Sequence, residues 1–75
     1  MILYEGKTGC FYQVKGVYVE EAVTRRLQAL GINDGTCIKI LNRKNKGAMI
    51  IQVRGTRLAL GRHISYCIEV KEETA

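Results

Sequence analysis

Glycine spacing is the feature of this sequence that most constrains its fold. Eight glycines and no proline divide the 75 residues into segments of roughly the length of one β-strand. Frequent glycine-marked turns between short segments are typical of a small all-β barrel or sandwich. A chain of this size has room for only one thin core, so we expect a single domain over residues 1–75 and no separate substrate domain.

Alternation of apolar and polar residues, or enrichment in β-branched and aromatic residues, predicts five strands among these segments. The predicted strands cover residues 8–15, 36–43, 48–54, 57–60 and 66–71. Side chains two positions apart lie on the same face of a strand, so one set of alternate residues should form the core. The residues expected to point inward are Ile38, Ile40, Met49, Ile51, Val53, Ile68 and Val70.

One segment has the period of a helix instead. Its apolar residues recur at steps of three and four, which places them in one stripe on a helix of three turns: Val19, Ala22, Val23, Leu27 and Leu30. Gly31 suits the left-handed position after such a helix, and Ile32 can make the apolar contact of a Schellman motif. The sequence therefore predicts a mainly β fold, a small barrel of about five strands with one α-helix inserted after the first strand.

The cations are concentrated in one part of the chain. Twelve Lys and Arg residues against seven Asp and Glu residues give a net charge of +5, and all seven acids lie outside residues 35–68. A surface of one sign attracts acidic partners, which could be a nucleic acid, an acidic protein face or anionic lipid headgroups. A merely solubilising surface explains the same charges. The cations of this segment are Lys39, Arg43, Lys44, Lys46, Arg54, Arg57 and Arg62.

Residue types that carry catalysis are sparse. No pair of acids has helical or cross-strand spacing, so acid–base hydrolysis has no evident pair. We expect His63, the single histidine, to be an exposed loop residue near the start of a strand. Cys10 and Cys37 are expected to be small hydrophobic residues in strands, and Cys67 to be more exposed. We therefore expect a protein that is not an enzyme and that uses no cofactor and no metal ion.

The sequence also carries no sign of membrane insertion or secretion. No apolar run reaches the roughly 18–20 residues that cross a bilayer, and the first residues do not resemble a signal peptide. Three widely spaced cysteines, an odd number, do not suit a disulfide-stapled secreted domain. We therefore expect a cytosolic, reduced protein.

The stretch from Arg26 to Thr36, with four shorter motifs at 6–9, 46–49, 53–62 and 67–70, resembles in order and spacing the FeoA family, the small cytosolic partners of the ferrous iron transporter FeoB. The longest, RLQALGINDGT at 26–36, is similar to the family signature R-L-x-x-L-G-[ILM]-x-x-G-[ST]. Residues 53–62 resemble the block V-x-G-x-x-[IVL]-A-L-x-[RK]. The other three are an opening G-x-x-G at 6–9, residues 46–49, which fall where the family has a basic hairpin ending in glycine, and a closing x-I-x-V strand at 67–70. The sequence departs from the pattern at Asp34, where proline is frequent, and at 63–65, where many members have an acid.

This resemblance implies an SH3-like barrel and a role in Fe²⁺ uptake without chemistry of its own. The implied partner is the cytosolic part of FeoB, which carries a G-protein domain and would recruit the chain to the inner face of the membrane. A similar barrel is the C-terminal module of metal-dependent iron repressors, but this chain shows no DNA-binding helix pair. The resemblance therefore favours a protein-binding module with no membrane span of its own.

Two groups of residues are the candidates for partner binding. The densest motif supplies Arg26, Leu27, Leu30 and Gly31, although Leu27 and Leu30 also suit core packing. The cationic segment supplies Arg43, Lys44, Lys46, Arg54, Arg57 and Arg62. Two alternative functions also fit the sequence. A nucleic-acid-binding barrel would use the same cations, with Tyr12 and Tyr66 as exposed aromatics, and a metal-sensing module would use His63 and Cys67.

Overall fold

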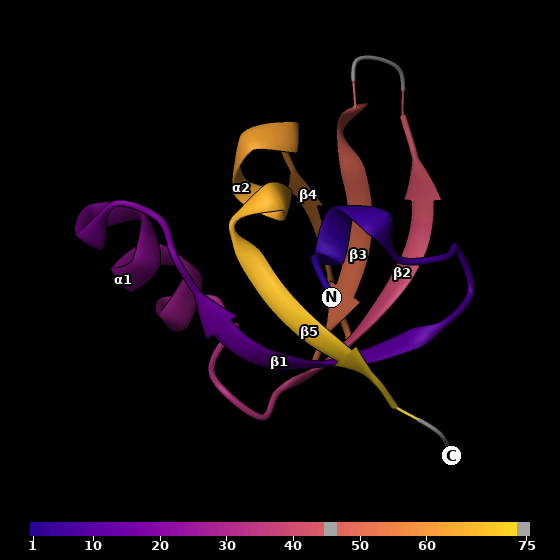
Figure 1. The fold of residues 1–75 in the computed structure, drawn as a ribbon, viewed down its shortest axis with the longest axis horizontal. Coiled ribbons are helices and arrows are strands. Elements are labelled where there is room, and N and C mark those ends of the chain that lie inside the picture. Colours follow the sequence, from indigo (N-terminus) through magenta and orange to yellow (C-terminus); the bar gives the residue numbers. More distant parts are fainter. Residues whose placement is uncertain (45–46, 74–75) are drawn as a thin grey trace.

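The computed structural model describes residues 1–44 and 47–73, which form one curled antiparallel sheet with a helix at its side (Figure 1). The strands lie in the order β4-β3-β2-β1-β5. Their bounds are β1 (Phe11–Val17), β2 (Cys37–Arg43), β3 (Met49–Val53), β4 (Thr56–Leu60) and β5 (Ile68–Glu72). Helix α1 (Glu21–Ala29) follows β1. The five predicted strands and the inserted helix are thus confirmed, with strand ends that differ by up to three residues.

Two irregularities in strand pairing bend the sheet around its core. The register shifts between Val14 and Gly16 where β1 meets β5, and between Ile40 and Asn42 where β2 meets β3. Such bulges increase the local twist of a strand and allow a short sheet to curl. The outer edge of β5 is covered by the start of the chain, because the Val70 N–H donates to the Met1 carbonyl at 2.7 Å. Strands β4 and β5 are the two edges of the sheet and are not paired with each other.

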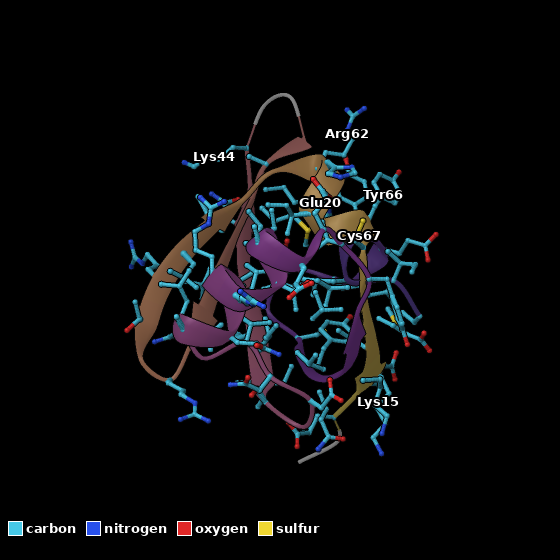
Figure 2. The ribbon with its side chains drawn as sticks, turned by 90° about the vertical axis from the view of Figure 1, so that its left-hand side faces the viewer. Lys15, Glu20, Lys44, Arg62, Tyr66 and Cys67 are labelled. Carbon is cyan, nitrogen blue, oxygen red and sulfur yellow. The ribbon has the colours of Figure 1, made fainter. Side chains whose placement is uncertain are left out.

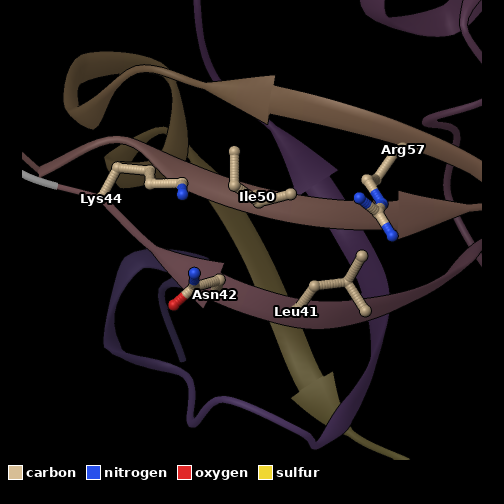
Figure 3. A pocket seen from close by; sticks show the side chains of 5 residues that line it. All are labelled: Leu41, Asn42, Lys44, Ile50 and Arg57. Atoms are coloured by element: carbon tan, nitrogen blue, oxygen red, sulfur yellow. The ribbon is translucent and has the colours of Figure 1, made fainter.

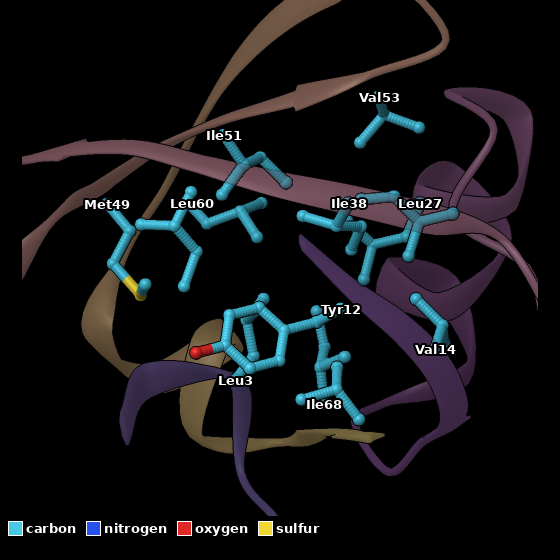
Figure 4. Packing of buried hydrophobic residues seen from close by; sticks show 13 residues of the cluster. Leu3, Tyr12, Val14, Leu27, Ile38, Met49, Ile51, Val53, Leu60 and Ile68 are labelled. Carbon is cyan, nitrogen blue, oxygen red and sulfur yellow. The ribbon is translucent and has the colours of Figure 1, made fainter. Parts of the chain in front are cut away.

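Alternate residues of the strands fill the core, as the sequence predicts (Figure 4). All seven side chains expected to point inward are buried. Tyr12 was predicted to be an exposed aromatic residue, and this was wrong, because its side chain is only 1% exposed. Its hydroxyl oxygen accepts a hydrogen bond from the Lys7 backbone N–H at 2.8 Å, so burial leaves the polar end of the ring paired. The buried apolar residues are Leu3, Tyr12, Val14, Leu27, Ile32, Ile38, Ile40, Met49, Ile51, Val53, Leu60, Ile68 and Val70.

Helix α1 ends as predicted but buries less of its stripe than expected. The Ile32 N–H donates to the Leu27 carbonyl at 2.9 Å and the Gly31 N–H donates to the Gln28 carbonyl at 3.0 Å, which is the Schellman pattern. Gly31 has a φ of 99°, the left-handed conformation that such an end requires. Leu27 is buried, whereas Leu30 is 46% exposed, so core packing, the alternative considered for Leu30, was wrong. In Figure 1 the helix lies to one side of the sheet; Leu27 of its last turn still reaches the core, whereas Leu30, at the C-cap, stays about half-exposed.

Two short helical segments were not predicted. The 3₁₀ helix η1 (Leu3–Glu5) inserts Leu3 into the core, and α2 (Arg62–Tyr66) joins β4 to β5. The sequence pattern assigns Tyr66 to the last strand, which was wrong, because Tyr66 ends α2 instead. Ser65 is fully buried in this helix, and its hydroxyl lies 3.1 Å from the carbonyl oxygens of Gly61 and Arg62, which pair it internally. A helix of barely more than one turn is too short to show an apolar period.

Among the described residues, no helix has both the length and the apolar character that crossing a membrane requires.

Candidate docking surfaces

A small groove lies between α1, β4 and α2, and we refer to it as the helix groove. Its cavity measures about 180 Å³. Six of its seven lining residues are apolar, and the seventh is the cation Arg26. No acid lines it, so it presents an apolar surface with one positive charge at its side. The lining residues are Val23, Arg26, Leu27, Leu30, Ala59, Leu60 and Ile64.

The local sequence explains why this groove stays open. Gly31 turns the chain directly after the helix, and Leu30, at the C-cap, is about half-exposed. Arg25, by contrast, pairs with Glu21 one turn earlier on the exposed side of the helix. Arg26, Leu27 and Leu30 of the densest sequence motif all line the groove, and Leu27 also packs into the core.

A second depression lies on the outer face of the sheet, and we refer to it as the sheet pocket (Figure 3). It measures about 400 Å³ and is formed by β2, β3 and β4 with the residue that follows β2. Leu41 and Ile50 provide its apolar centre, Asn42 an amide, and Lys44 and Arg57 two cations at separate places on its border. The structure thus brings Lys44 and Arg57 to one surface, although thirteen positions separate them in the sequence.

Arg43 lies apart from both depressions and contacts the chain's own backbone. Its Nη2 donates to the carbonyl oxygens of Tyr4 and Gly6, and its guanidinium carbon lies 5.0 Å from the centroid of the Tyr4 ring. The Tyr4 ring stacks in turn on Tyr66, with 4.5 Å between centroids. These contacts connect η1 to β2 and α2, so the guanidinium of Arg43 is engaged in contacts within the fold.

The other candidate cations occupy further separate positions. Arg54 has a φ of 52° in the turn between β3 and β4, and its Cδ would lie 3.2 Å from a Cβ added to Gly31. Arg62 begins α2, and its Nε would lie only 2.7 Å from a Cβ added to Gly47. Both glycines therefore provide room for an arginine stem. Lys46 falls outside the described residues.

Groups that could bind metal ions or act as nucleophiles are few. The described residues hold no cluster of three or more His, Cys, Asp or Glu side chains that could hold a metal ion. His63 is exposed as expected, but it lies in α2, where its Nε2 is 3.6 Å from the Glu20 carboxylate. Its own backbone N–H, and after it the neighbouring His63, lower the pKa of Glu20.

The cysteines differ from the prediction. Cys10 and Cys37 are exposed and not buried in strands, because Cys10 precedes β1 and Cys37 points to the outer face of β2. Cys67 is partly buried, so it is the least exposed of the three and not the most. Loss of solvent around the thiol, together with the carboxylate of Glu73, raises the pKa of Cys37 to about 11. All three are free thiols.

Sequence reasoning missed several residues of the helix groove. Ala59 and Leu60 lie within a recognised motif but carry no local sign of a surface role, and Ile64 belongs to the unpredicted α2. Val23 was placed on the helical stripe without a site role. Only the three-dimensional approach of α1 to β4 and α2 joins them, and no spacing rule in the sequence signals that approach.

Comparison with known proteins identifies the family. Residues 1–72 match the model of the FeoA domain family. No curated protein is significantly similar to the chain in sequence. Among solved structures, the solution structure of FeoA from Chlorobium tepidum has 32% identity and a TM-score of 0.93, and the match covers 99% of this chain and 71% of that one.

Two crystal structures of FeoA proteins support the same assignment. One, described as an iron uptake regulatory protein, has 25% identity and a TM-score of 0.87, with 97% of each chain covered. The other is FeoA of Stenotrophomonas maltophilia complexed with zinc, with 26% identity and a TM-score of 0.81, covering 95% of this chain and 89% of that one. The latter is described as an SH3 domain protein, so the predicted SH3-like fold is confirmed. The chain belongs to the FeoA family, whose members are associated with ferrous iron transport.

Proposed function

We propose that this chain is a non-enzymatic accessory module of ferrous iron uptake that binds the cytosolic region of FeoB bearing the G-protein domain. Membership of the FeoA family supports the link to ferrous iron transport. One observation supports the binding role most directly: the helix groove is apolar, open and lined by a cation, and these are the features of a contact surface. The module would act in the cytoplasm, at the inner face of the membrane where such a partner lies.

The occupant we propose for the helix groove is an apolar side chain of FeoB next to a carboxylate. Leu30 and its apolar neighbours would cover the apolar side chain, and Arg26 would pair with the carboxylate. Gly31 allows the chain to turn away at this point and so keeps the groove accessible. A depression of about 180 Å³ admits one side chain and not a long segment. A module of 75 residues offers at most an interface of standard size, about 800 Å² per partner, so we expect a transient complex.

The scattered cations have a different proposed role. Arg54, Arg57, Arg62, Lys44 and Lys46 would raise the rate of encounter with an acidic face of FeoB by long-range attraction. Arg43 keeps its positive charge and would add to this attraction, but its guanidinium lies on the Tyr4 ring and is hydrogen-bonded to backbone carbonyls, so it would contribute little direct pairing with FeoB. Steering of this kind weakens as salt is added, since charges further apart than about 10 Å are screened at about 0.1 M salt.

A binding assay with the cytosolic domain of FeoB tests the proposal. The domain is immobilised without nucleotide, with GDP or with a GTP analogue, and capture of the chain is measured at low salt. We expect binding in at least one nucleotide state and at least a tenfold loss with Leu30→Ala. Phe11→Ala is the matched control, because Phe11 is 47% exposed against 46% for Leu30 and lies at the start of β1, away from α1.

Two variants that remove the same charge at neighbouring positions test the role of Arg26. Arg26→Gln should weaken capture, whereas Arg25→Gln, which removes the same charge on the side of Glu21, should not. No capture in any nucleotide state would disprove the proposed partner. Equal losses for Leu30→Ala and Phe11→Ala would disprove the helix groove as the docking surface while leaving the partner in place.

A further inference from the structure

The two edges of the sheet differ in what covers them. The outer edge of β5 is covered by the start of the chain, where Ile2 forms a bridge with Glu69 and the Val70 N–H donates to the Met1 carbonyl. Strand β4 forms the other edge, and among the described residues it pairs with β3 alone. Figure 2 shows β4 along the left-hand border of the molecule, with no described strand beyond it. The fold therefore leaves one edge of its sheet open.

The turn before β4 determines which of its backbone groups point outward. Arg54 and Gly55 have φ values of 52° and 79°, and positive φ at both central residues is what a two-residue type I′ hairpin turn requires. The residues that flank such a turn form a hydrogen-bonded pair, and pairs with and without hydrogen bonds then alternate along antiparallel strands. Here the flanking residues are paired and the register continues without a bulge, so Arg57 and Ala59 fall in pairs without hydrogen bonds. Their N–H and C=O groups therefore point away from β3.

These outward backbone groups have no partner in the described part of the chain. Outside the regular strands and helices, no backbone or side-chain hydrogen bond of the described residues involves Arg57 or Ala59. Both residues are exposed, and unpaired backbone groups are rarely buried away from water. The edge of β4 thus presents alternate N–H and C=O groups to solvent, which is the template on which a further strand pairs.

The side chains beside this edge indicate which kind of segment it takes. Ala59 also lines the helix groove, so a strand paired with β4 lies next to the groove and can place one apolar side chain in it. Arg26 lines the same groove and Arg57 extends from the edge strand itself, so an acidic segment matches the local charge. A second copy of this chain does not match it, because edge-to-edge pairing would bring together the Arg57 side chains of two molecules that each carry a net charge of +5.

We propose that a short acidic segment of FeoB binds in extended form along β4 and adds a sixth strand to the sheet. This inference rests on the proposed function and adds the mode of binding to it. Main-chain hydrogen bonds with Arg57 and Ala59 provide affinity for any extended backbone, whereas the helix groove and Arg26 select its apolar and acidic side chains. The groove holds one side chain of the segment, and the edge of β4 holds its backbone.

Amide hydrogen exchange measured by nuclear magnetic resonance tests the proposal at single residues. The ¹⁵N-labelled chain is measured alone and with the unlabelled cytosolic domain of FeoB. In the free chain, the Arg57 and Ala59 amides should exchange at least about tenfold faster than the Leu58 amide, which bonds to β3. In the complex, the Arg57 and Ala59 amides should slow by at least about tenfold, because they then donate to the added strand.

A pair of substitutions at one position tests the backbone contact separately from the side chains. Ala59→Pro removes the outward N–H and leaves the bonds to β3 in place, since proline is tolerated on an edge strand where the N–H faces solvent. Ala59→Ser is the matched control, because it keeps the N–H and a small side chain. We expect Ala59→Pro to weaken capture by FeoB at least about tenfold and Ala59→Ser to change it less than about twofold.

The possible outcomes distinguish this inference from the proposed function. Absence of any binding to FeoB would overturn both. Binding that leaves the exchange of the Arg57 and Ala59 amides unchanged, or equal capture of Ala59→Pro and Ala59→Ser, would overturn strand addition alone. Slow exchange of both amides in the free chain, increasing with its concentration, would show that a second copy occupies the edge and would overturn it too. If the spectrum of Ala59→Pro shows that this variant is unfolded, exchange in the parent complex decides the question.

Discussion

The guanidinium of Arg43 lies on the ring of Tyr4, with 5.0 Å between its central carbon and the ring centroid, and the ring stacks on Tyr66. The same guanidinium donates to the carbonyl oxygens of Tyr4 and Gly6. One side chain at the end of β2 thus holds η1 and, through the stack, α2. The connection matters because η1 and α2 are the two elements that lie outside the regular sheet and its main helix.

Arg43→Lys should therefore destabilise the fold although it preserves charge. A lysine cannot donate from a planar fork to two carbonyls while it lies flat on a ring. We expect the free energy of unfolding to fall by about 1–2 kcal/mol, which lowers Tm by roughly 4–8 °C per kcal/mol in a domain of this size. Thermal unfolding followed by circular dichroism measures it. Arg57→Lys, on the outer face of the sheet, is the control and should cost less than about 0.5 kcal/mol; equal losses would contradict the role of Arg43.

Gly31→Ala should be costly because the position is left-handed and crowded. Gly31 has a φ of 99°, and an added Cβ would lie 3.2 Å from the Arg54 Cδ. A residue with a Cβ in this conformation loses about 1–2 kcal/mol, and the Schellman end of α1 depends on it. Urea unfolding provides the measurement. Gly61→Ala is the matched control, because Gly61 has a φ of −68° and no atom within 4 Å of an added Cβ. A larger loss at Gly61 than at Gly31 would refute the argument.

Much of the fold could be predicted from the sequence because it rests on local patterns. Alternation at Ile38 and Ile40 identifies the buried face of β2, and the glycine at 31 identifies the end of α1. Tyr12 shows where such patterns fail. Its place in a strand was predicted, but its burial was not. The buried hydroxyl accepts a hydrogen bond from the Lys7 backbone N–H, and Lys7 lies outside the strand.

The candidate site could be predicted only in part, since surfaces are formed by elements distant in the sequence. The motif around Leu30 was identified, but its exposure follows from where α1 lies relative to the sheet. The acid-free segment suggested one cationic face, whereas its members lie on several surfaces: Lys44 and Arg57 at the sheet pocket, Arg43 on Tyr4 and Arg54 on Gly31. Charge counted along a chain does not reveal which strand face carries each residue.

Cys37 should react slowly for an exposed thiol. Its pKa is raised to about 11, mainly because solvent is removed around the thiol and further because Glu73 is close, so at about pH 8 it holds roughly a hundredfold less thiolate than an ordinary cysteine. Alkylation by iodoacetamide, followed by mass spectrometry, should be correspondingly slower in the folded chain than in denaturant. Glu73→Gln should restore part of the rate, and no change in rate on unfolding would contradict the shift.

The sign of the pH effect follows from the same shift. The folded chain holds the Cys37 proton more tightly than the unfolded chain, so any stability that it contributes is present below the ordinary thiol pKa and is lost as pH rises toward 11. Between about pH 6 and pH 8 the thiol is neutral in the folded state, and Cys37→Ser should leave the slope of stability against pH unchanged.

Two kinds of substitution should affect the association rate and the dissociation rate of the proposed complex with FeoB separately. Exchanging Lys44 and Arg57 for Gln removes two exposed cations of the sheet pocket and should lower the association rate, with a weaker dependence on salt. Leu30→Ala removes an apolar contact of the helix groove and should raise the dissociation rate with little effect of salt. Surface plasmon resonance at several salt concentrations measures both rates. If the two cations changed dissociation as strongly as Leu30 did, the sheet pocket and not the helix groove would be the contact surface, because a charge that only steers a partner acts before contact is made.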